Sequence, residues 1–135
     1  MIWAPIQQEE ERPQVSATGL SQDVDEYRRR LAEQPDEQID AWAGELMRDM
    51  SIRRGVLPVL EELRHATGLS DSGLERAYAV GGGAPATAGR TADGQLMVPA
   101  IGLRHIVPGL RKELPDARQR LIDYLTLNFE ELVYI

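Results

Sequence analysis

The spacing of apolar residues constrains this fold more than any other feature of the sequence. From residue 20 onward, large apolar side chains recur three or four positions apart, which is the period of an α-helix. The first two stripes hold Leu20, Val24, Tyr27 and Leu31, then Ile39, Trp42, Ala43, Leu46 and Met50. Similar stripes follow residues 58, 70, 99 and 115. The pattern predicts an all-α fold, a compact bundle of about five to six helices.

Prolines and glycines mark where these helices begin and end. Three prolines each precede an apolar stripe: Pro35, Pro58 and Pro115. Proline is favoured at the first helical position because its missing N–H has no intrahelical partner there, so each is expected to open a helix. Gly68 is expected to end one helix, and Ser70 to cap the next. Pro108 should kink or divide the segment that follows residue 99.

Residues 81–95 interrupt the helical pattern. Three adjacent glycines and Pro85 make a helix unfavourable there, at about 1 kcal/mol per glycine and about 3 kcal/mol for an interior proline. A phosphate-binding P-loop needs Gly-x-x-x-x-Gly-Lys after a strand. Here the interval from Gly83 to Gly89 is one residue too long, Arg90 replaces the lysine, and a helix precedes it. We therefore expect a flexible glycine-rich loop without a nucleotide site.

The two ends of the chain differ in composition from its middle. The stretch from Gln7 to Pro13 is polar and charged and has few residues able to form a core, which predicts that residues 1–19 are a disordered tail and leaves residues 20–135 as a single helical domain. Trp3 stands out in that tail, and Tyr134 and Ile135 end the chain on apolar residues. Such anchors are typical of protein interfaces, so we expect a partner or the chain itself to cover them.

Charge and composition narrow the classes of function. Residues 1–50 hold twelve acidic residues against five arginines, which accounts for the whole net charge of −7. An acidic half repels nucleic-acid backbones and attracts basic protein surfaces. The chain has no cysteine, no apolar run of about 18 residues and no secretory signal at its start. These features predict a cytoplasmic protein without disulfides or membrane spans.

No catalytic, metal-binding or cofactor-binding constellation is evident. The only two histidines, His65 and His105, are forty positions apart, whereas a helix-borne metal pair needs a spacing of three or four. Adjacent acidic residues such as Glu61 and Glu62 are typical of a solvated helix face, which does not raise a carboxyl pKa for acid catalysis. We therefore expect neither metal nor cofactor and no enzyme, with a small enzyme of unrecognised site as an alternative.

One segment carries a resemblance to a known family. The residues concerned are Leu63, Arg64, Gly68, Leu69, Ser70, Leu74 and Val80. With this spacing, residues 63–80 resemble the helix-turn-helix of phage-repressor-type DNA-binding domains. The resemblance implies a transcriptional regulator in which Ser70, Arg76 and Arg90 would contact DNA. The sequence departs from the family at Asp71, where a glutamine is frequent, and at the glycines where the recognition helix would follow.

A non-catalytic protein-binding module is the function that these features favour. Inhibitors, immunity proteins, antitoxins, chaperones and secretion adaptors are of this class, and an acidic helical face would steer such a protein to a basic partner. The candidate partner-binding residues are Trp3, Asp36, Glu37, Asp40, Tyr134 and Ile135. Nucleic acid is a disfavoured partner, and a homo-oligomer is compatible with the sequence.

Overall fold

The computed structural model describes residues 20–128, with side chains from residue 24 onward. Its α-helices are α1 (Leu20–Ala32), α2 (Asp36–Arg54), α3 (Val56–Thr67), α4 (Asp71–Val80), α5 (Ile106–Glu113) and α6 (Ala117–Leu127). Two 3₁₀ helices, η2 (Pro85–Thr87) and η3 (Ala100–His105), flank a two-stranded sheet of β1 (Gly89–Arg90) and β2 (Leu96–Met97). The predicted all-α bundle is confirmed. The predicted tail, residues 1–19, lies outside the described residues.

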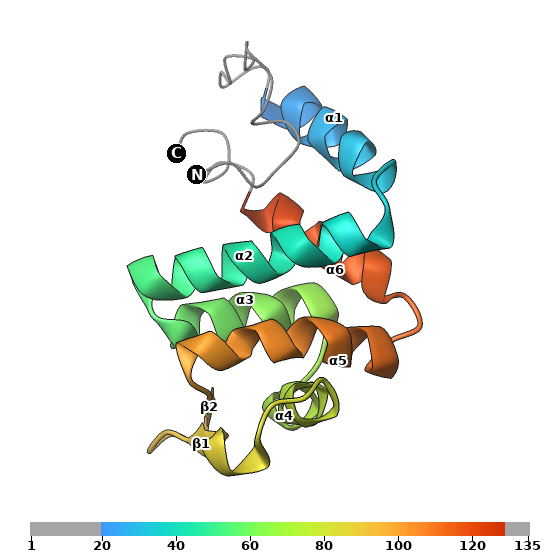
Figure 1. Ribbon diagram of the computed structural model, residues 1–135. Helices are drawn as coiled ribbons and strands as arrows, with labels where there is room; N and C mark the ends of the chain where they lie inside the picture. The colour runs from blue at the N-terminus through green and yellow to red at the C-terminus, as the bar shows by residue number, and fades with distance from the viewer. Residues whose placement is uncertain (1–19, 129–135) are drawn as a thin grey trace.

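Helices α2, α3 and α5 form the centre of the bundle (Figure 1). Helices α2 and α3 are joined at Gly55, whose φ of 98° lets the chain turn back at once. Helix α6 packs on both of them, and α1 packs on α6. Helix α4 is seen end-on below α5 in Figure 1, and η3 leads into α5 alongside α2. The wall formed by η3 and α5 therefore faces α2 over much of its length.

The predicted apolar stripes form the core. Buried members are Tyr27, Leu31, Ile39, Trp42, Ala43, Leu46, Met50, Val59, Leu60, Leu63, Leu74, Tyr78, Leu103, Ile106, Leu110, Leu121, Tyr124 and Leu125. Each large apolar side chain removed from water contributes about 1.5 to 3 kcal/mol. Burial of the apolar face of each helix therefore stabilises the packing of the helices against one another.

The helix boundaries agree with the prediction in part. Gly68 ends α3 in a left-handed conformation, and the Ser70 hydroxyl accepts a hydrogen bond from the Gly73 amide at 3.2 Å, as expected of a helix cap. Pro35, however, lies just before α2, and α3 begins at Val56, two residues ahead of Pro58. Pro58 still falls within the first turn, where its missing N–H costs no hydrogen bond.

The segment from Pro99 is divided, as predicted, but ahead of Pro108. The 3₁₀ helix η3 passes directly into α5 at Ile106, and Pro108 is the third residue of α5. At that position the ring lies in the first turn, so it leaves the later hydrogen bonds of α5 intact.

Residues 81–95 form no α-helix, as predicted, but they have a defined structure. After a turn at residues 81–82 come η2 and then β1, which pairs antiparallel with β2 so that Gly89 faces Met97 and Arg90 faces Leu96. The two strands are joined through Gly94, whose φ is 86°. The sequence-based expectation did not include this hairpin.

Helices α4 and α5 approach each other through glycines. A Cβ atom built on Gly109 would lie 1.7 Å from the carbonyl oxygen of Ala77, and one on Gly81 would lie 1.8 Å from the carbonyl oxygen of His105. Real Cβ atoms do not come this close to an oxygen, so backbone packs directly on backbone at both points. Helix α5 is thereby held against α4.

A candidate binding groove between α2 and α5

A groove runs between α2 and the wall formed by η3 and α5. Its volume is about 760 Å³. The lining residues are Glu37, Asp40, Ala41, Gly44, Glu45 and Arg48 of α2, and Ala100, Ile101, Arg104, Val107 and Pro108 of η3 and α5. This feature is called the α2–α5 groove below. A volume of this order accommodates a small ligand or a few side chains of a partner.

Gly44 lies near the middle of α2 and lines the groove. A glycine inside a helix costs about 0.5 to 1 kcal/mol relative to alanine. Its φ is not positive, and a Cβ built on it would meet no atom of the described residues within 4 Å, its two chain neighbours and the adjacent backbone of α2 apart. Neither the backbone nor internal packing therefore requires glycine at this position. Its effect is to leave open space above α2.

Ile101 projects from η3 at one end of the α2–α5 groove. Its relative exposure is 72%, although large apolar side chains are usually buried. Ile52 on α2 is equally exposed, at 72%, but it does not line the groove. The two isoleucines therefore form a matched pair, one inside the groove and one outside it.

Charged side chains of both signs surround the apolar surface. No ion pair or side-chain hydrogen bond joins Glu37, Glu45 or Arg104 to another residue of the described part of the chain. Among the described residues, the side chain of Arg48 pairs only with that of its neighbour Asp49, at 3.4 Å, and it remains 62% exposed. These charges are available to groups that enter the groove.

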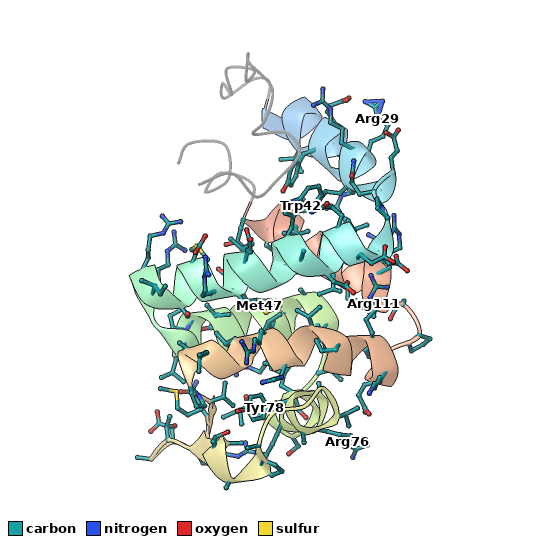
Figure 2. The ribbon with its side chains drawn as sticks, viewed as in Figure 1. Arg29, Trp42, Met47, Arg76, Tyr78 and Arg111 are labelled. Carbon is teal, nitrogen blue, oxygen red and sulfur yellow. The ribbon has the colours of Figure 1, made fainter. Side chains whose placement is uncertain are left out.

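Asp36 and Asp40, two members of the predicted acidic face, have partners inside the chain. Asp40 accepts hydrogen bonds from Nε and Nη2 of Arg111 at 3.0 and 2.8 Å, and Figure 2 shows Arg111 near the end of α5, where α2 begins. Asp36 accepts one from Arg118 at 2.6 Å and lies 3.4 Å from Arg111. The hydrogen bond from Arg118, together with the positive charges of Arg111 and Arg118, holds the pKa of Asp36 below its ordinary value. Of the predicted acidic residues, Glu37 alone is left unpaired among the described residues.

Three predicted anchors cannot be placed. Trp3, Tyr134 and Ile135 lie outside the described residues. Trp42, the other tryptophan, is a core residue with 7% exposure, and Figure 2 shows it on α2.

The residues proposed for DNA contact lie around α4. The hydroxyl of Ser70 caps this helix. Arg76 is 72% exposed and lies 3.9 Å from Glu113. Arg90 donates to Glu75 at 2.6 Å and to the carbonyl of Gly94 at 3.1 Å, so its charge is largely used within the protein. Beyond α4 the next α-helix is α5, which begins at Ile106.

The two histidines lie in different surroundings. His65 is exposed, and His105 lies edge-on to the ring of Tyr78, with centroids 6.1 Å apart. Within residues 24–128 no group of three or more histidines, cysteines or acidic residues is placed to hold a metal ion. Among the helices of residues 20–128, none combines the length and the apolar character that crossing a membrane requires.

Sequence reasoning missed the residues that make this groove. Gly44, Ile101 and Arg104 were not among the candidates. The one signal that the sequence offers is a glycine in the middle of a predicted helix, where glycine is unfavourable. The exposure of Ile101 depends on the tertiary arrangement of η3 and α2, and the local sequence pattern does not predict that arrangement.

Comparison with known proteins found no relative of this chain. No protein-family model, curated protein or solved structure matches the chain.

Proposed function

We propose that this chain is a non-catalytic protein-binding module, and that the α2–α5 groove receives an apolar segment of its protein partner. The observation that carries the proposal is Gly44. This residue costs α2 helix stability, has no conformational or packing reason among the described residues, and lines the groove from the middle of α2. A partner side chain that approaches the α2 backbone closely would account for it.

The lining defines the chemistry of such a partner. Ala41, Ala100, Ile101, Val107 and Pro108 offer an apolar surface, on which aliphatic or aromatic side chains would be desolvated. Recognition of this kind occurs when an amphipathic helix or an extended segment lies in a hydrophobic groove.

The unpaired charges of the groove would then set the orientation of the bound partner segment. Acidic groups of the partner would lie near Arg104 and Arg48, and basic groups near Glu37 and Glu45. Such pairs at the edge of an interface contribute more to specificity and association rate than to affinity. The partner therefore needs both signs of charge and is not defined by basic character alone.

The test compares two isoleucines of equal exposure. The tagged protein, its Ile101→Glu variant and its Ile52→Glu variant are used to isolate bound proteins from the cell in which the chain is made. A specific partner is expected with the wild type and with Ile52→Glu, and a loss of at least tenfold with Ile101→Glu. Gly44→Trp, which fills the groove from α2, should cause the same loss.

Two results would contradict the proposal. The first is equal recovery of every bound protein by all four forms. The second is salt-sensitive binding of duplex DNA that is abolished by Arg76→Ala, which would favour a transcriptional regulator.

A further inference from the structure

We propose that the partner of the α2–α5 groove is a second copy of this chain, whose α2 packs antiparallel on the first and is related to it by a two-fold axis. The inference rests on the proposed function and names the partner that the proposed function leaves open. In a two-fold dimer both copies use the same surface, so each group of that surface must find its complement within the surface itself. The charged and the small residues of α2 meet this requirement.

The unpaired charges that line the groove are balanced in sign. Asp40 is paired within its own chain, which leaves the acidic Glu37 and Glu45 and the basic Arg48 and Arg104. Apart from the 3.4 Å contact of Arg48 with its neighbour, none of these four is paired with another of the described residues. The whole chain has a net charge of −7, which opposes self-association, whereas this surface has no excess of acid or base. Two copies therefore repel each other less here than elsewhere.

One face of α2 carries acid and base at opposite ends. Four residues spaced four, three and four positions apart share this face: Glu37, Ala41, Gly44 and Arg48. All four line the groove. Glu37 and Arg48 lie about 16 Å apart along the helix, at a rise of 1.5 Å per residue, which is too far for them to pair within one copy.

An antiparallel second α2 would pair both ends at once. The midpoint of Glu37 and Arg48 falls between residues 42 and 43, and so does the midpoint of Ala41 and Gly44. A two-fold axis through this point places Glu37 opposite Arg48 of the second copy, and Ala41 opposite Gly44 of the second copy, each twice in the dimer. A parallel arrangement would instead place like charges together, so the face is self-complementary in the antiparallel direction.

The small residues at the centre of this face allow a close approach. Helix axes pack 8 to 10 Å apart, depending on the side chains at the contact. Ala41 carries only a methyl group and Gly44 carries no side chain, so two α2 helices can approach to about 8 Å. The long side chains of Glu37 and Arg48 at the two ends are then within reach of each other. The dimer thus gives Gly44 a specific role, because the methyl group of Ala41 from the second copy would fill the open space above it.

The opposite wall of the groove adds to the same polarity. The segment of η3 and α5 runs beside α2 in the opposite direction (Figure 1), and Arg111 near the end of α5 meets Asp40 near the start of α2. Arg104, seven residues before Arg111, therefore lies towards the end of the groove that Arg48 occupies. Both arginines stand where Glu37 of the second copy would arrive.

The test measures the mass of the full-length protein by sedimentation equilibrium, from micromolar to millimolar concentration. The wild type is expected to pass from monomer to dimer, and added salt should weaken the dimer. Glu37→Arg and Arg48→Glu should each raise the Kd of the dimer at least tenfold, because each places like charges opposite each other twice. Glu61→Arg makes the same change of charge at an exposed position of α3 outside the groove, and it should leave the Kd within about twofold.

Mixing the two charge variants tests the pairing itself. In a mixed dimer of Glu37→Arg with Arg48→Glu, one contact joins the two introduced charges and the other joins the two original ones, so both contacts are between opposite charges. The mixture should therefore form a one-to-one dimer with an affinity near that of the wild type, although each variant alone is monomeric. The double variant that carries both substitutions should also form a dimer.

Two results would overturn the inference. One is a wild type that stays monomeric over the whole range of concentration. The other is a wild type that forms dimers while the mixture of variants does not, because the copies would then meet through another surface or in another direction. Capture of a different protein through Ile101 by a chain that stays monomeric would leave the proposed function in place and remove only this inference.

Discussion

Asp40 and Arg111 lie 71 residues apart in the sequence and meet in a two-pronged ion pair, with Nε and Nη2 of the guanidinium 3.0 and 2.8 Å from the same carboxylate oxygen. Their side chains are 31% and 23% exposed. Arg111 also reaches Asp36 at 3.4 Å. The pair ties the beginning of α2 to the end of α5 and so fixes the distance between the two walls at one end of the α2–α5 groove.

This ion pair should contribute measurably to stability. Asp40→Asn and Arg111→Met are each expected to lower the free energy of unfolding by about 1 kcal/mol, because the partly buried pair is held by several charge-assisted hydrogen bonds. A double-mutant cycle measured by urea unfolding should give a coupling of similar size. Arg29→Met, which removes a 64%-exposed side chain paired with Glu26 within one helix, serves as the control and should change stability by less than about 0.5 kcal/mol. Additive effects of the two substitutions would show that the pair is not coupled.

Gly44→Ala should stabilise the protein. A Cβ at this position meets nothing within 4 Å, so the substitution gains helix propensity, about 0.5 to 1 kcal/mol, without a clash. The gain should appear as a higher urea midpoint with an unchanged slope. Gly68→Ala is the contrasting change, since its φ of 75° is unfavourable for alanine and stability should fall. A loss of stability in Gly44→Ala would contradict the view that the groove is open above α2.

Gly109→Ala should be among the most damaging single changes in the chain. The added Cβ would lie 1.7 Å from the carbonyl oxygen of Ala77, so α4 and α5 must separate, at an expected cost of about 3 kcal/mol. Gly89→Ala is the matched control, because a Cβ there meets nothing within 4 Å and the change should stay within about 0.5 kcal/mol. Thermal unfolding followed by circular dichroism would compare the melting temperatures of the two variants. Similar melting temperatures would show that the two helices do not touch as described.

Alkaline pH should destabilise the fold through its buried phenols. Burial raises the pKa of Tyr124 above its ordinary value of 10.0, and the nearby Glu62 acts in the same direction. The unfolded chain therefore releases this proton first, so stability that is full below pH 10 falls as the pH rises further. Burial shifts Tyr27 the same way.

Tyr124→Phe should lessen this alkaline loss in urea unfolding measured from pH 7 to 11. At neutral pH the substitution should be neutral or stabilising, because the Tyr124 hydroxyl is buried without a hydrogen-bond partner in the described residues. If the loss of stability above pH 10 is the same in the variant as in the wild type, the Tyr124 phenol ionises equally well in the folded and the unfolded chain.

The local parts of this fold were predictable. The stripes around Tyr27, Ile39 and Leu46 identified helices and their buried faces, because one period governs both. The cap at Ser70 and the left-handed end at Gly68 also follow from the preferences of single residues.

The features of the fold and of the groove that were not predicted depend on contacts between segments far apart in the sequence. The pairing of Asp40 with Arg111 and of Asp36 with Arg118 spans 71 and 82 residues, and no local pattern reports it. The glycines at 81 and 83 were interpreted as helix breakers, although the structure also uses them for close packing against His105 and Tyr78. The hairpin did have a local signal, because an Asp-Gly dipeptide such as Asp93-Gly94 is typical of the turn between two strands. Its strands are only two residues long, which is too short for a strand pattern to show in the sequence.

The glycine contacts at positions 81 and 109 have a mechanical consequence for the α2–α5 groove. With backbone resting on backbone, α4 and α5 behave as one stiff body that side-chain rotation cannot loosen. The wall of the groove that α5 contributes, with Val107 and Pro108, is therefore fixed in place by backbone contacts and not by side-chain packing alone. A ligand of this wall would meet a surface whose shape is already set before binding.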